Sequence, residues 1–78
     1  MDGRVEKVFA EVLGVPVDSI TETSSPDNLP KWDSAAAIDL FLAIEDEFGV
    51  RLTTKEFVAM RSIALVKKVL AAKGITDV

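Results

Sequence analysis

The sequence contains no cysteine and no histidine among its 78 residues. Without cysteine no disulfide can stabilise the fold, and without either residue the usual zinc sites cannot be built, so we expect no metal site. A histidine-activated nucleophile is likewise excluded, and no glycine-rich phosphate loop is present. These absences make an enzyme the least favoured class of function, and we expect no catalytic residue.

Long apolar segments are missing as well. Asp39 and the acidic run at 45–47 interrupt the most apolar region, so we expect no membrane insertion. The start, Met1-Asp2-Gly3-Arg4, shows no apolar signal region. These features predict a cytoplasmic protein, and we expect it to be a monomer.

The length allows one domain, residues 1–78, close to the lower limit at which a core alone sustains a fold. Stability must come from packing, for which a hydrophobic content of 49% is sufficient. No alternation of period two is long enough for a sheet. Helical periodicity is clear instead, and a first helix is predicted by apolar residues at Val5, Val8, Phe9, Val12 and Leu13.

Gly14 and Pro16 end this helix, and a long loop follows from Val15 to Asp33. Ile20 and Leu29 are expected to hold the loop against the core. Loops of this length in compact domains are usually functional or disordered. We expect a functional one, because it leads directly to Ser34.

Three further helices are predicted after the loop. The first covers Ala35 to Phe48 and ends at Gly49, and a short one extends through Met60. Thr53 and Glu56 form a capping-box pattern for the short helix, and Ser62 can cap the last one. The last helix has apolar residues at Ile63, Val66, Val69 and Leu70, lysines suited to its dipole at Lys67, Lys68 and Lys73, and a stop at Gly74. The fold class is thus all-α, a four-helix bundle with a short third helix and a long first loop.

The helix at 35–48 has two different faces. One is apolar and suited to burial, with Ala37, Leu40, Phe41, Ile44 and Phe48. The other mixes apolar and acidic side chains around a hydroxyl, which is typical of a docking surface: Ser34, Ala35, Ile38, Asp39, Leu42, Glu45 and Asp46.

Charge is distributed unevenly along the chain, whose net charge is −4. From Asp18 to Glu47 there are eight acids and one base, a net −7, whereas Arg51 to Lys73 contains six bases and one acid, a net +5. The acidic segment contains Ser34, so basic partners would be attracted to it and nucleic acid repelled.

Ser34 follows Asp33 at the start of a predicted helix, where an Asp-Ser pair is usually an N-cap. The two residues can divide the work, because Asp33 can cap while Ser34 stays exposed. A carboxylate beside a serine is a poor general base, so Ser34 is better interpreted as an acceptor that another enzyme modifies. Trp32 is expected to anchor the loop.

Several motifs resemble the acyl carrier protein family over nearly the whole chain. They are Trp32-Asp33-Ser34, Ile38-Asp39-Leu40 and the run from Ala43 to Val50, together with Leu13-Gly14-Val15 and Pro26 to Leu29 upstream. The resemblance implies that Ser34 receives 4′-phosphopantetheine from coenzyme A through a phosphopantetheinyl transferase, with Asp33 beside it. The thiol of this arm would hold acyl groups as thioesters in a fatty-acid-like or polyketide-like pathway.

The resemblance also implies partners, namely acyl-loading, condensing and acyl-transferring enzymes with basic docking patches. Asp39, Glu45 and Asp46 would meet those patches, and Ile38 and Leu42 would enter apolar pockets. The family usually has leucine after the serine, where this chain has Ala35, a contact residue for the transferase. Two alternatives stay open: a peptidyl or aminoacyl carrier, and an unmodified helical interaction module.

Overall fold

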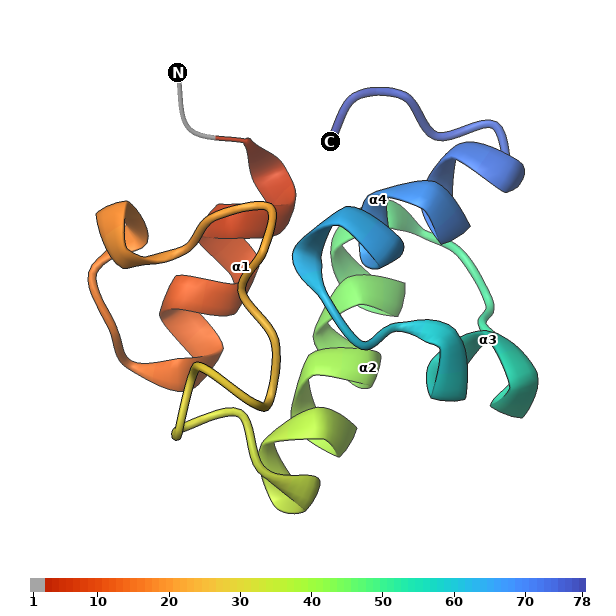
Figure 1. The fold of residues 1–78 in the computed structure, drawn as a ribbon. Helices are drawn as coiled ribbons and strands as arrows, with labels where there is room; N and C mark the ends of the chain where they lie inside the picture. Colours follow the sequence, from red (N-terminus) through yellow and green to blue (C-terminus); the bar gives the residue numbers. More distant parts are fainter. Residues whose placement is uncertain (1–2) are drawn as a thin grey trace.

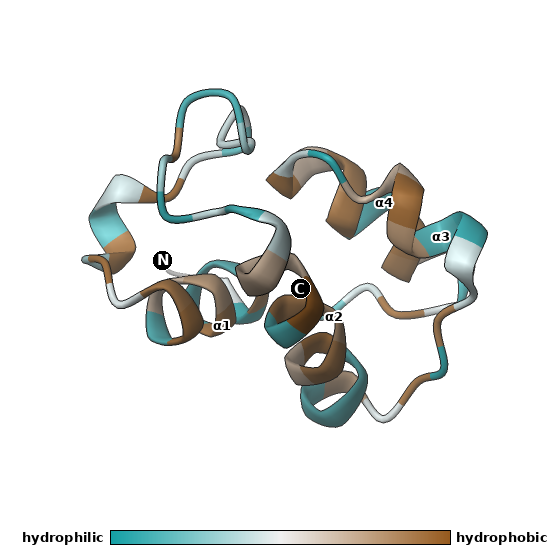
Figure 2. Ribbon diagram, turned by 90° about the horizontal axis from the view of Figure 1, so that it is seen from below, coloured by the Kyte–Doolittle hydropathy of each residue, from teal (hydrophilic) through white to brown (hydrophobic). Residues whose placement is uncertain are grey.

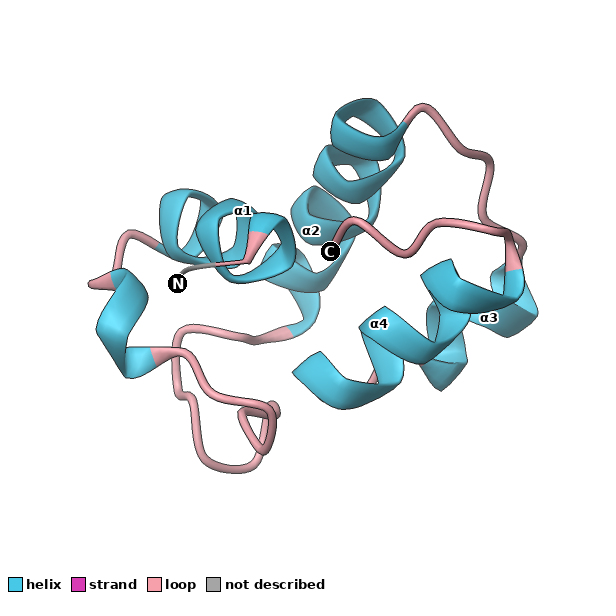
Figure 3. Ribbon diagram, turned by 90° about the horizontal axis from the view of Figure 1, so that it is seen from above, coloured by secondary structure: helices cyan, strands magenta, loops and turns pink. Residues whose placement is uncertain are grey.

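The computed structural model describes residues 3–78, which form helices and loops without a β-strand (Figure 1, Figure 3). Met1 and Asp2, at the start of the predicted domain, lie outside this range. The helices are α1 (Arg4–Leu13), α2 (Ser34–Phe48), α3 (Thr54–Ala59) and α4 (Ile63–Ala72), with a 3-10 turn, η1, at Val17–Ser19. The predicted all-α bundle, with its short third helix and long first loop, is confirmed.

The core forms around α1, which packs against both α2 and α4, while α3 packs against α4 (Figure 1). Apolar residues are spread over all four helices in Figure 2, whereas the loop between α1 and α2 is largely polar. None of the helices within residues 3–78 is long and apolar enough to cross a lipid bilayer. The most deeply buried large side chains are Val5, Phe9, Leu40, Ile44, Ile63, Val66 and Leu70.

Helix ends follow the local chemistry of the sequence. Gly14 and Gly49 adopt left-handed conformations with φ of 67° and 63°, which a residue with a side chain rarely adopts. Thr53 and Glu56 form the predicted capping box, and Ser62 caps α4 by accepting a hydrogen bond from the Leu65 N–H. The third helix ends at Ala59 and not at Met60, whose N–H bonds to the Phe57 carbonyl in a tighter turn.

Four residues predicted to face the core are only half-buried: Val12, Ala37, Phe41 and Val69. For Ala37 and Phe41 the reason is that α3 does not close tightly over α2. Phe41 reaches α3 through an edge-on contact with Phe57, with ring centroids 5.1 Å apart. The two helices therefore leave space beside Ala37.

The loop from 15 to 33 is well integrated into the fold. Ile20 is buried and Leu29 is half-buried against the core, as predicted. The backbone carbonyls of Glu22 and Ser24 accept hydrogen bonds from the N–H groups of Ala64 and Ile63, both at 3.1 Å. These donors belong to the first turn of α4, which has no partners for them within the helix. The loop thus helps to cap α4, a structural role that sequence reasoning did not include.

Lys67 also helps to attach the long loop to α4, and it does not lie in the last turn of α4, where it would interact with the helix dipole. Its ammonium group donates to Glu6 on α1 at 2.7 Å and to Glu22 in the loop at 2.8 Å. The interpretation of Lys67 as a C-terminal dipole partner is therefore wrong. The two carboxylates recruit the lysine because it is half-buried and needs compensation for its charge.

Candidate functional site

Ser34 is the first residue of α2, and its side chain is exposed. The capping task falls to Asp33, whose Oδ1 accepts a hydrogen bond from the Ala36 N–H at 2.9 Å. Within residues 3–78 the Ser34 hydroxyl takes part in no hydrogen bond. The predicted division of work between these two residues is confirmed, and it leaves the hydroxyl available for modification.

Trp32 holds this start of α2 in place. The indole ring is 4% exposed and packs edge-on against Phe9 of α1, with centroids 4.8 Å apart. The backbone N–H of Trp32 also bonds to the Leu29 carbonyl at 2.9 Å. Trp32 is therefore the loop anchor that the sequence predicted. Because Ser34 follows two residues later, its position is tied to the core.

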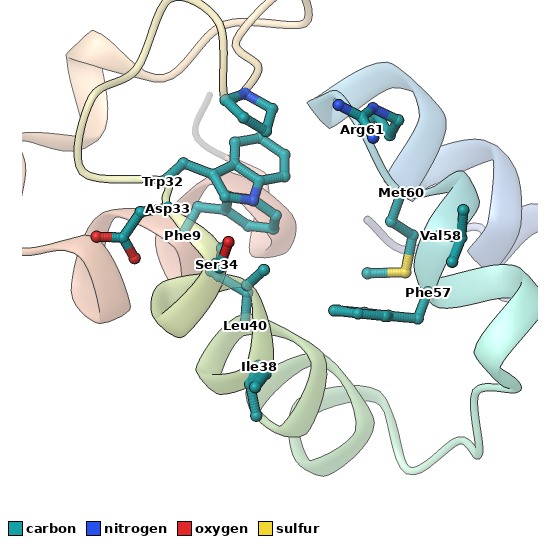
Figure 4. Close-up of a pocket in the computed structure, with 12 residues that line it drawn as sticks. Phe9, Trp32, Asp33, Ser34, Ile38, Leu40, Phe57, Val58, Met60 and Arg61 are labelled. Atoms are coloured by element: carbon teal, nitrogen blue, oxygen red, sulfur yellow. The ribbon is translucent and has the colours of Figure 1, made fainter.

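A cavity of about 590 Å³ opens beside Ser34, between α2 and the segment formed by α3 and its link to α4 (Figure 4). Ser34 and Asp33 lie at one side of it, and Arg61 lies across from them. The remaining lining is apolar, and it comes from five parts of the chain: Phe9, Pro26, Trp32, Ala37, Ile38, Leu40, Phe57, Val58 and Met60.

The structure distributes the predicted docking residues unequally. Ile38 and Leu42 are 58% and 57% exposed, so two large aliphatic side chains of α2 face solvent. Ala35, Asp39 and Asp46 are exposed on the same helix. Glu45 differs, because it is half-buried and its Oε2 accepts a hydrogen bond from the Leu52 N–H at 2.8 Å.

Sequence reasoning missed the opposite wall of the cavity. Phe57, Val58, Met60 and Arg61 come from α3 and the link after it, and Val58 is 61% exposed. The available signal was the apolar pair Phe57 and Val58 in a helix of six residues. A helix that short covers little of the core, so two large apolar side chains in it indicate a second surface. The sequence alone does not show which helix the pair faces.

The chemistry of the site centres on one exposed hydroxyl, that of Ser34. Asp33, the nearest carboxylate in sequence, is committed to capping, so no base is positioned at the Ser34 hydroxyl. Among residues 3–78 no cluster of acidic side chains is arranged to hold a metal ion. The arrangement defines a surface serine on a rigid helix start, next to an apolar cavity.

Comparison with known proteins agrees with this arrangement. The family described as "Phosphopantetheine attachment site" matches residues 3–70. The chain is also 33% identical over 60 residues to an "Acyl carrier protein" from Saccharopolyspora erythraea, covering 77% of this chain and 63% of that relative. The chain thus spans less than two thirds of the length of the relative it matches.

Because the family match extends over most of the chain, this protein belongs to the phosphopantetheine attachment family. Its cofactor is covalently attached 4′-phosphopantetheine. The residues present fit such a group, since the Ser34 hydroxyl is exposed and unengaged within the described chain. The adjacent cavity gives apolar parts of an attached chain a place to leave water.

Proposed function

We propose that this protein is an acyl carrier protein and that Ser34 is the residue that bears the phosphopantetheine arm. The observation that supports this proposal most directly is the exposed, unengaged Ser34 hydroxyl at the start of α2, where Asp33 supplies the cap. When bound, the arm supplies a thiol that holds acyl groups as thioesters. The chain itself contributes attachment and presentation, and partner enzymes contribute catalysis.

The cavity supports acyl cargo over aminoacyl cargo. Its wall is formed mainly by aliphatic and aromatic side chains, and burial of a hydrocarbon chain contributes about 0.8 kcal/mol for each methylene group. A charged α-amino group would find a single carboxylate, that of Asp33, in this lining. The pathway we favour is therefore fatty-acid-like or polyketide-like biosynthesis in the cytoplasm.

The exposed face of α2 supports transient docking of partner enzymes. Ile38 and Leu42 offer apolar contacts, and Asp39 and Asp46 offer charge to basic patches. Glu45 is the weakest of the docking candidates, since it already supports the link after α2. Exposed charges of this kind accelerate encounter more than they strengthen a complex, which suits a monomeric carrier that serves several enzymes.

The test is modification of the purified protein by a broad-specificity phosphopantetheinyl transferase with coenzyme A and magnesium. Intact mass should increase by one phosphopantetheinyl group in the natural protein, and Ser34→Ala should show no increase. Ser19→Ala is the matched control, because Ser19 is exposed but lies in η1, and it should be modified normally. A mass increase that persists in Ser34→Ala would disprove the assignment.

Loading then separates acyl carrier from aminoacyl carrier. The modified protein should accept malonyl or other acyl groups from acyltransferases and should be a poor acceptor for enzymes that activate amino acids as adenylates. The opposite preference would reassign the protein to the peptidyl carriers. Partner binding that is unchanged in unmodified Ser34→Ala would favour an interaction module.

A further inference from the structure

The cavity beside Ser34 contains two hydrogen-bond donors that have no acceptor within the described chain. One is the indole N–H of Trp32 and the other is the guanidinium group of Arg61. Both residues line the cavity, and Figure 4 shows them on different walls, with the indole nitrogen toward Ser34. Apart from these two donors, the polar residues of the lining are Asp33 and Ser34, and the other lining residues are apolar.

The Trp32 indole N–H is unusual for a side chain that is 4% exposed. Buried indole N–H groups normally find a partner, yet no acceptor among residues 3–78 receives this one. Within that range, Glu6 Oε1 is the one fully buried polar side-chain atom without a partner. The Trp32 indole nitrogen, which also lacks a partner, is therefore not fully buried. Because Trp32 lines the cavity, a group bound there can approach this N–H.

Arg61 is the second donor. The ion pairs within residues 3–78 engage Arg4, Lys67 and Lys73, and none engages Arg61. A guanidinium group has five N–H donors and no acceptor, so it can be satisfied only by oxygen atoms of water or of a ligand. Arg61 is the single cation in the cavity lining.

A purely alkyl chain uses neither donor. If it filled the cavity it would cover the indole N–H and remove water from it, and leaving a buried donor unpaired costs free energy. A chain with a carbonyl or carboxylate oxygen would satisfy the donor while its methylene groups contact Phe57, Met60 and Leu40. The apolar wall and the two opposed donors together thus distinguish a saturated alkyl chain from an oxygenated chain of the same length.

We propose that the cavity between α2 and α3 selects acyl groups that carry an oxygen acceptor along the chain, and that Trp32 and Arg61 are the residues that select them. This inference rests on the proposed function, since the acyl group must be tethered at Ser34. It specifies the cargo class as oxygenated chains in preference to saturated alkyl chains. Neither residue takes part in chemistry, so both act through binding alone.

The experiment compares the protein loaded with hexanoyl, 3-oxohexanoyl and 5-oxohexanoyl groups against the protein with the unacylated arm. Because Trp32 is the single tryptophan, its indole N–H gives one assignable signal in a proton–nitrogen correlation spectrum. In at least one oxo form this signal should move downfield, and its exchange with water should slow by about fivefold, as one added hydrogen bond predicts. The hexanoyl form should show neither effect.

Thioester exchange with a small thiol, which leaves the ketone groups intact and releases the thiol of the arm, supplies a second readout. For each acyl group, the cleavage rate on the protein is divided by the rate of a small-molecule thioester of the same chain. For the favoured oxo form this ratio should be about five- to tenfold lower than for hexanoyl. Arg61→Met should remove that difference while keeping the length of the side chain. Arg51→Met is the matched control, because Arg51 is also exposed but does not line the cavity, and it should keep the difference.

Trp32→Phe removes the N–H and preserves most of the ring packing against Phe9. It should abolish the preference for oxo chains without abolishing loading, and thermal unfolding would verify that the variant is folded. Identical indole signals in the alkyl and oxo forms would overturn the inference. The same holds if the unacylated arm alone produces the full shift, since the donors would then serve the arm. Failure of loading at Ser34 would instead refute the proposed function.

Discussion

At the residue scale, the site depends on two neighbours with separate tasks. Asp33 satisfies the Ala36 N–H at the start of α2, and Ser34 is left exposed with its hydroxyl unengaged by the described chain. The sequence predicted both tasks, because capping depends on residues within three positions of each other. Ala35, the next residue, is also exposed and therefore has no packing role that would require a small side chain.

Ala35→Leu tests whether this position limits recognition by the transferase. The larger side chain adds apolar surface beside Ser34, and burial of one or two more methylene groups in the complex should raise kcat/KM for modification about four- to fifteenfold. The rate of phosphopantetheine transfer measures this effect. Thermal stability should change little, since the position is exposed, and an unchanged rate would show that the transferase does not contact residue 35.

At the element scale, α3 is held by few contacts. Its attachments are the Phe41–Phe57 ring contact, the capping box at its start, and an ion pair of 3.0 Å between Glu56 and Lys73, the residue that follows α4. The pKa of Glu56 is lowered because its carboxylate accepts the Thr53 backbone N–H and, secondarily, contacts the Lys73 ammonium group. One carboxylate therefore both starts α3 and joins it to α4.

Acidification should loosen α3 before the other helices. Since the folded-state pKa of Glu56 lies below its ordinary value of 4.5, its stabilising contribution is complete above that pH and is lost as pH falls through the folded value. Amide exchange should therefore accelerate in α3 relative to α1 below about pH 4.5. In Glu56→Gln the carboxylate no longer titrates, so this difference between the two helices should vanish; its persistence would assign the effect to another group.

Lys67, like Glu56, joins separate elements through its side chain. It joins α4 to α1 through Glu6 and to the long loop through Glu22. Lys67→Met should lower the free energy of unfolding by about 1–2 kcal/mol, because charge-assisted hydrogen bonds are lost and Glu6 stays half-buried without its cation. Urea denaturation measures the change, and Lys68→Met, at an exposed neighbour outside these ion pairs, should cost much less.

At the scale of the whole molecule, some of the acids that make the segment from Asp18 to Glu47 negative are engaged in contacts within the fold. Glu22, Glu45 and Glu47 are engaged by Lys67, the Leu52 N–H and Arg4, respectively. On the exposed face of α2, Asp39 and Asp46 have no ion-pair partner among residues 3–78. The field that a partner meets is thus concentrated on fewer acids than the net −7 of the segment suggests.

Replacing both Asp39 and Asp46 with asparagine should slow encounter with a basic partner. We expect kcat/KM of the transferase to fall about three- to tenfold at low salt, as the loss of two exposed charge contacts predicts, and its dependence on ionic strength to weaken. The double variant Asp18→Asn with Asp27→Asn makes the same change in net charge within the loop region. An equal effect in both double variants would show that net charge acts, and not the face of α2.

The sequence by itself determined the helices and their caps, and it singled out Ser34 as the proposed attachment residue. These features depend on residues within about four positions of one another, whose periodicity and hydrogen bonding can be read directly. Tertiary structure alone decided that Phe57 and Met60 face Ser34 across a cavity, that Lys67 joins three segments, and that Glu45 is engaged. It also placed Arg61 across from Trp32. Such pairings join residues far apart in the chain, so they follow from how the helices pack and not from any local pattern.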